Sequence, residues 1–84
     1  MTETSPAAGT VPVETTVLRV FAEVLGRDAV AGEDDFVELG GTSLSAAIAV
    51  SKLEGALGVE IPLRLLMEDT RIGAFAERVG ALTD

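Results

Sequence analysis

Apolar residues near the start of this chain recur every three to four positions, which is the spacing of one face of an α-helix. The stretch follows Pro12, which suits the first turn of a helix, and it stops at Gly26, which suits a C-cap. The apolar stripe consists of Val13, Val17, Val20 and Val24, widened by Leu18, Phe21 and Leu25. The opposite face consists of Thr15, Thr16, Arg19, Ala22 and Glu23. The pattern predicts an amphipathic helix.

A second helical stretch, residues 43–57, is apolar on two faces. One stripe is typical of a helix that faces a core and consists of Ala46, Ala49, Val50, Leu53 and Leu57. The opposite face consists of Leu44, Ile48, Ser51 and Gly55, with Ala47 beside them. A domain of 84 residues is too small to enclose a helix, so this second stripe predicts a docking face for a partner. Scattered surface apolar residues, which are normal on monomers, are the alternative.

Two shorter signals complete the helical pattern. After a cap at Gly58, Pro62 can open a short helical turn that contains Leu63, Leu65, Leu66 and Met67. Thr70 suits the N-cap of a last helix, whose buried face consists of Ile72, Phe75, Ala76, Val79 and Leu82. The predicted fold class is all-α, a small bundle of three main helices plus one short helix. Residues 1–11 are expected to form a flexible tail, and residues 12–82 the folded domain.

The connection between the first two main helices is long and acidic, and a loop of this length in a compact domain usually serves function. Phe36 and Leu39 are its apolar residues that would pin it to the core. Asp34 or Asp35 could cap a short turn through Glu38. The acidic cluster lacks the ligand spacing and central glycine of an EF-hand, so a solvated loop is favoured over a calcium site.

Composition and charge narrow the classes of function. The chain has a net charge of −8 and contains no His, Cys, Tyr or Trp. Such a charge repels nucleic acids and suits basic protein partners. The missing residue types exclude a Ser-His-Asp triad, a disulfide and a thiolate metal site. No apolar run is long enough to span a membrane and no signal peptide precedes the domain, so a cytoplasmic protein is expected.

Ser43 is the candidate residue for a chemical reaction, because it lies where a loop containing two glycines becomes a helix. One interpretation is an N-cap. The other is a modified hydroxyl, since the helix N-terminus favours a phosphate, and Gly40 and Gly41 would leave room for an enzyme. Independent hydrolysis is disfavoured, because Lys52, the only lysine, lies nine residues further along the same helix.

The run Asp35-Phe36-x-Glu38-Leu39-Gly40-Gly41-Thr42-Ser43-Leu44 resembles the attachment motif of carrier proteins. Its LGG-x-SL form resembles peptidyl carrier proteins of nonribosomal peptide synthetases, rather than the G-x-DSL form of acyl carrier proteins. The similarity continues through residues 58–64 and 69–72 and covers most of residues 13–79. The resemblance implies that a phosphopantetheinyl transferase uses coenzyme A and Mg²⁺ to place 4′-phosphopantetheine on Ser43, with Gly41, Thr42 and Leu44 around it. The thiol of this arm would then hold an aminoacyl or peptidyl group as a thioester, and the chain itself would not be an enzyme.

The resemblance also implies partners for the second apolar stripe. An adenylation enzyme and condensation or tailoring enzymes would dock on Leu44, Ala47, Ile48, Ser51 and Leu66. The family usually has Asp or His where this chain has Thr42, which concerns the choice of transferase and adenylation enzyme. A monomeric, free-standing carrier is expected, although an excised module domain would look the same. The alternatives are an acyl carrier for polyketide or fatty acid synthesis and an unmodified acidic helical adaptor.

Overall fold

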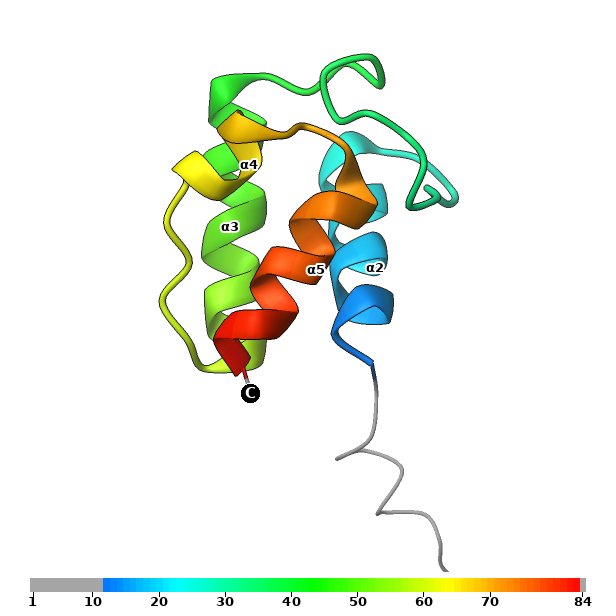
Figure 1. Ribbon diagram of the computed structural model, residues 1–84. Helices are drawn as coiled ribbons and strands as arrows, with labels where there is room; N and C mark the ends of the chain where they lie inside the picture. The colour runs from blue at the N-terminus through cyan, green and yellow to red at the C-terminus, as the bar shows by residue number, and fades with distance from the viewer. Residues whose placement is uncertain (1–11, 84) are drawn as a thin grey trace, which may run out of the picture.

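The structure, a computed structural model, describes residues 12–83, so the expected tail at residues 1–11 lies outside the described residues. Four helices follow one another: α2 (Val13–Leu25), α3 (Ser43–Leu57), α4 (Arg64–Glu68) and α5 (Ile72–Thr83). Helix α2 packs against both α3 and α5, and the short α4 packs against α5 (Figure 1). Residues 12–83 contain no strand, only an isolated bridge between Asp35 and Arg71. The all-α prediction is confirmed, with a long loop between α2 and α3.

The helix ends follow from the residues that the sequence places there. Gly26 and Gly58 have left-handed backbones, with φ of 68° and 71°, and cap α2 and α3 as expected. Pro12 differs from the prediction, because its extended backbone (ψ 144°) places it at the N-cap, just before the first turn. The fixed φ of proline fits both positions, so the residue type alone does not distinguish them.

The core is built around the three phenylalanines of the chain. The ring centroid of Phe21 on α2 lies 5.4 Å from that of Phe36 in the loop and 5.6 Å from that of Phe75 on α5. All three side chains are buried, which confirms Phe36 as an anchor of the loop. The other large, fully buried side chains are Leu53, Leu66, Ile72, Val17 and Val79.

Three expectations about burial are wrong. Thr16 and Ala22, expected on the exposed face of α2, are buried, because α2 is covered by α3 on one side and by α5 on the other. Leu82, expected in the core, is 42% exposed, because it lies in the last turn of α5. No helix among residues 12–83 is long and apolar enough to cross a membrane.

The start of α5 is also capped differently from the prediction. Thr70 does not accept a hydrogen bond from the helix; its hydroxyl donates to Asp35 Oδ2 at 2.8 Å. The first N–H groups of α5 donate to loop carbonyls instead, Ile72 N to Asp34 O at 2.9 Å and Gly73 N to Gly32 O at 2.8 Å. The loop therefore supplies the partners that an N-cap side chain would otherwise provide.

Candidate attachment site

Helix α3 begins with a reciprocal hydrogen-bonded cap that does not use Ser43. The N–H of Ser45 donates to Thr42 Oγ1 at 3.2 Å, and the N–H of Thr42 donates to Ser45 Oγ at 2.7 Å. This is a capping box, and Thr42, with its extended backbone, is the N-cap. The interpretation of Ser43 as the N-cap is therefore wrong.

Ser43 is the first residue of α3, and it is exposed. Within residues 12–83 its hydroxyl makes no hydrogen bond, whereas the neighbouring hydroxyls of Thr42 and Ser45 bond to each other and to the backbone. The N–H groups of the first turn of a helix carry partial positive charge, which favours an attached phosphate by about 0.3–1 kcal/mol at an exposed position. Of these three hydroxyls, that of Ser43 is the one open to reaction.

The two glycines before the site have different structural roles. Gly40 has a φ of 96° and faces open space, so it gives the loop a backbone conformation that other residues adopt with strain. The backbone of Gly41 packs directly against the ring of Phe36, and a Cβ on this residue would overlap the ring. Its N–H donates to Phe36 O at 2.9 Å. The expectation that Gly41 leaves room for an enzyme is therefore wrong, because the space that it leaves is filled by Phe36.

The turn before the glycines is held by charged groups. Asp35 Oδ1 accepts hydrogen bonds from the N–H groups of Val37 and Glu38, which confirms the predicted cap of this turn. The Thr70 hydroxyl is the main cause that lowers the pKa of Asp35, so this carboxylate is charged at neutral pH. Arg27, just after α2, donates to Leu39 O at 3.3 Å. These contacts fix the loop on both sides of Phe36.

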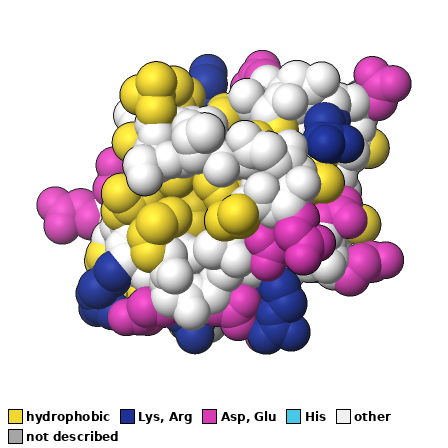
Figure 2. All heavy atoms as spheres, turned by 90° about the horizontal axis from the view of Figure 1, so that it is seen from above, with side chains coloured by type: hydrophobic (Ala, Val, Ile, Leu, Met, Phe, Trp, Pro, Cys, Tyr) yellow, Lys and Arg dark blue, Asp and Glu magenta, His cyan; other side chains and the backbone are white. Residues whose placement is uncertain are grey.

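The large hydrophobic side chains that remain exposed gather near the same end of the molecule. Five of the six in residues 12–83 lie on the loop, on α3 and on or beside α4, namely Val37, Leu44, Ile48, Leu63 and Met67. Figure 2 looks down on this end, and hydrophobic side chains form a broken band across it with charged groups around the rim. We call these five residues the apolar band. Exposed apolar residues concentrated in this way are typical of an interaction surface.

The predicted partner residues are found in two different environments. On α3, the four candidates are exposed, namely Leu44, Ala47, Ile48 and Ser51. Leu66, the candidate on α4, is fully buried, so its assignment to a docking face is wrong. Leu63 and Met67 are 38% and 45% exposed instead, and the N–H of Met67 donates to Leu63 O, which places them on one side of the turn. The sequence carries no signal that separates the two sides, because Leu63 is at helical spacing from both Leu66 and Met67.

Comparison with known families identifies the family of this chain. Residues 15–79 match the family model described as a phosphopantetheine attachment site. The chain belongs to this family. It is a carrier domain, which bears 4′-phosphopantetheine on a serine.

The carrier domain has relatives among peptide synthetases. It is 42% identical over 73 residues, 87% of its length, to a linear gramicidin synthase protein of Brevibacillus parabrevis. It spans only 1% of the length of that relative. It is also 39% identical over 64 residues, 76% of its length, to surfactin synthase subunit 3 of Bacillus subtilis (strain 168), and spans 5% of that protein.

Solved structures share the fold. BlmI, a type-II acyl-carrier-protein from Streptomyces verticillus involved in bleomycin biosynthesis, matches with a TM-score of 0.78 and 32% identity, covering 82% of this chain and 83% of that one. The carrier protein fold is therefore confirmed, and the family match gives the chain the role of a phosphopantetheine carrier.

Proposed function

We propose that Ser43 is the serine that carries 4′-phosphopantetheine, and that residues 12–82 form the carrier domain. The observation that supports this assignment is the exposed hydroxyl of Ser43 at the start of α3, beside two hydroxyls that are occupied by the cap. In the transfer, Ser43 Oγ would attack the β-phosphorus of coenzyme A. A new P–O bond would form, the pyrophosphate bond would break, and adenosine 3′,5′-bisphosphate would leave while the serine proton passes to a base of the transferase.

The chain itself would supply no catalytic group. Around Ser43 the chain has backbone N–H groups and the hydroxyl of Thr42, which is hydrogen-bonded to Ser45. It has no His to act as a base at neutral pH. Among residues 12–83 there is no group of three or more His, Cys, Asp or Glu side chains that could hold a metal ion. In the proposed reaction Mg²⁺ would be held by the transferase. The domain would thus be a substrate of the transferase and a carrier of the attached group, rather than an enzyme.

The partners would be enzymes that dock on the apolar band. A structure that resembles this chain contains a phosphopantetheine transferase, Sfp, with coenzyme A and a peptidyl carrier protein; it matches with a TM-score of 0.76 and 29% identity, covering 82% of this chain and 90% of that one. A transferase, an adenylation enzyme, and condensation or tailoring enzymes would bind here in turn. Thr42 would present no charge to them, because its side chain is neutral, and its hydroxyl already accepts a hydrogen bond from the N–H of Ser45.

Intact-mass measurement tests the attachment. The domain is incubated with coenzyme A, Mg²⁺ and a broad-specificity transferase, and one phosphopantetheine is expected per chain. Ser43→Ala should abolish the gain in mass, whereas the matched control Ser45→Ala should keep it. A gain retained by Ser43→Ala, or no gain in the unaltered chain, would refute the assignment.

An acyl carrier is the second candidate, because BlmI is described as an acyl-carrier-protein. Loading of the modified domain separates the two candidates. Aminoacylation by an adenylation enzyme supports the peptidyl type, and acceptance of a malonyl group alone supports the acyl type.

A further inference from the structure

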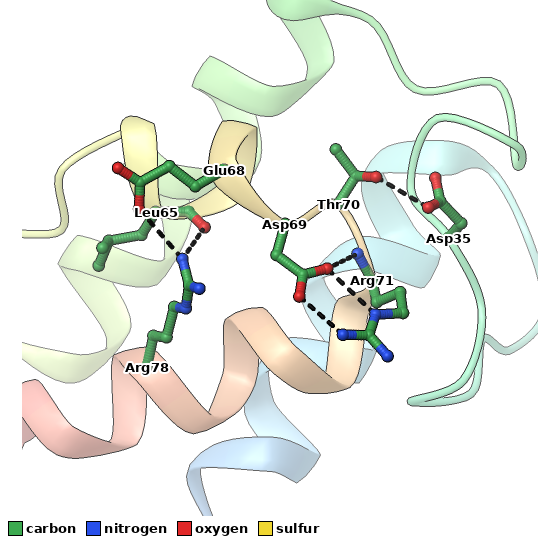
Figure 3. A network of polar contacts seen from close by, with 7 residues as sticks. All are labelled: Asp35, Leu65, Glu68, Asp69, Thr70, Arg71 and Arg78. Carbon is green, nitrogen blue, oxygen red and sulfur yellow. Dashed lines mark hydrogen bonds and ion pairs between the residues drawn. The ribbon is translucent and has the colours of Figure 1, made fainter.

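The carboxylate of Asp35 joins two segments that are far apart in the sequence. Its Oδ2 accepts a hydrogen bond from the hydroxyl of Thr70, 35 residues away in the connection between α4 and α5 (Figure 3). Its Oδ1 accepts from the N–H of Val37 at 2.8 Å and from that of Glu38 at 3.3 Å. One half-buried carboxylate therefore holds the turn that leads to the attachment site and fixes it to the connection between α4 and α5 (Figure 1).

A main-chain hydrogen bond supports the same contact. The N–H of Phe36 donates to Thr70 O at 2.8 Å, so the Asp35–Thr70 side-chain pair lies directly beside a backbone link between the same two segments. The acceptor in this pair is charged, and the Thr70 hydroxyl is the largest influence that lowers the pKa of Asp35. Hydrogen bonds to charged groups are stronger than those between neutral groups.

The turn held by Asp35 continues directly into the attachment site. Gly41 lies on the ring of Phe36, and its N–H donates to Phe36 O. The next residue, Thr42, is the N-cap of α3, and Ser43 follows it. A shift of the turn at Asp35 would therefore move the backbone of Ser43, which carries the reacting hydroxyl.

We infer that Asp35 and Thr70 are positioning residues for the phosphoryl transfer to Ser43, an inference that rests on the proposed function. Neither residue touches the reacting atoms. Their hydrogen bond keeps the loop in the conformation that presents Ser43. Without it the loop opens more often, and the transferase meets a smaller fraction of competent domains. The apparent affinity of a partner falls in proportion to that fraction, while the chemical step in the bound complex is unchanged.

Transferase kinetics on the full chain test the inference. Thr70→Val removes the hydroxyl and keeps the shape of the side chain, and we expect the KM for the carrier to rise about threefold or more with kcat unchanged. Thr70→Ser restores a hydroxyl and should return KM to that of the unaltered chain. Asp34→Asn is the matched control, because its carboxylate accepts from the N–H of Ala31 at 2.8 Å and not from the N–H groups of Val37 and Glu38.

Amide hydrogen exchange provides a second measurement. In Thr70→Val the amide of Gly41 should exchange about tenfold faster, whereas that of Leu53, in the middle of α3, should not change. Faster exchange at both positions would show global destabilisation and would overturn the inference. If Thr70→Val does not fold, Thr70→Ala replaces it, because alanine places no methyl group beside the Asp35 carboxylate. The same changes in amide exchange at Gly41 and Leu53 are then expected.

The outcomes separate the inference from the proposed function. An unchanged KM in Thr70→Val, a fall in kcat alone, an equal effect of Thr70→Ser, or an equal effect of Asp34→Asn overturns the positioning role. If the unaltered chain is not modified at Ser43 at all, the proposed function fails first. A change in KM that follows the presence of the hydroxyl at residue 70 supports the positioning role.

Discussion

Replacing Gly41 with alanine tests how the loop before Ser43 is packed. The added Cβ would overlap the Phe36 ring, which cannot retreat because it is buried against Phe21, with 5.4 Å between the ring centroids. The backbone of the loop would have to move instead. Adding a methyl group to a packed site of this kind typically costs about 1–3 kcal/mol. A domain of this size has only about 5 kcal/mol of stability to lose, so the effect should be large.

Urea unfolding followed by far-ultraviolet circular dichroism measures this cost, since the chain has no Trp or Tyr for fluorescence. With an m-value of about 1 kcal/mol per M, the midpoint for Gly41→Ala should fall by roughly 1–3 M. Gly55→Ala is the control, because that glycine lies within α3 with nothing near the added carbon. It should stabilise the domain by about 0.5–1 kcal/mol.

A double-mutant cycle shows whether the Phe36 ring is the cause. In a Phe36→Leu background the ring is absent, and Gly41→Ala should cost about 1 kcal/mol less than in the unaltered chain. If the cost is the same in both backgrounds, or is below about 0.5 kcal/mol in the unaltered chain, the contact between Gly41 and the ring does not determine the loop.

Three further predictions concern α4, the apolar band and acid stability. Leu66→Ala should lower the free energy of unfolding in urea by about 2–5 kcal/mol, whereas Met67→Ala should change it by less than about 0.5 kcal/mol. Similar effects of the two substitutions would contradict the burial of Leu66 and the exposure of Met67. Ile48→Asp should leave the circular dichroism spectrum unchanged and lower kcat/KM for the transferase about tenfold, and unfolding of this variant would instead show that Ile48 belongs to the core. Arg71, through its side-chain hydrogen bond, lowers the pKa of Asp69 from 3.8 to about 2, so the folded chain binds fewer protons than the unfolded chain between these values. The resulting stability is complete above pH 3.8 and is lost as the pH falls toward about 2. Arg71→Gln should flatten this part of a plot of urea midpoint against pH, and an unchanged slope would contradict the assignment.

The helices could be predicted because each main helix has its own apolar period and because glycines mark the ends of two of them. Phe36 could be predicted because it is the only aromatic residue of the loop between α2 and α3. The side of α4 that faces the core could not be predicted, because this turn is apolar at nearly every position. Only the packing of α4 against α5 places Leu66, rather than Met67, in the core. A helix of five residues has too few positions for its period to fix a phase.

At the proposed attachment site the sequence predicts that Ser43 is modified, but it does not predict the geometry of the cap beside it. Thr42 and Ser43 are both suitable N-caps, and the decisive signal is the hydroxyl of Ser45, three residues after Thr42. The roles of Asp35 and Thr70 depend on a contact between residues 35 positions apart, and no local pattern encodes such a contact. The close approach of Gly32 and Gly73, where a Cβ on Gly73 would lie 2.9 Å from Gly32 O, is hidden for the same reason.

The cluster of Phe21, Phe36 and Phe75 has a practical consequence for spectroscopy. These three rings are the only aromatic side chains of the chain, and they come from α2, the loop and α5. Near-ultraviolet dichroism of the unmodified domain therefore reports on one small group of rings, and one of them belongs to the loop. Loss of this signal while the helical spectrum persists would report release of the loop separately from melting of the bundle.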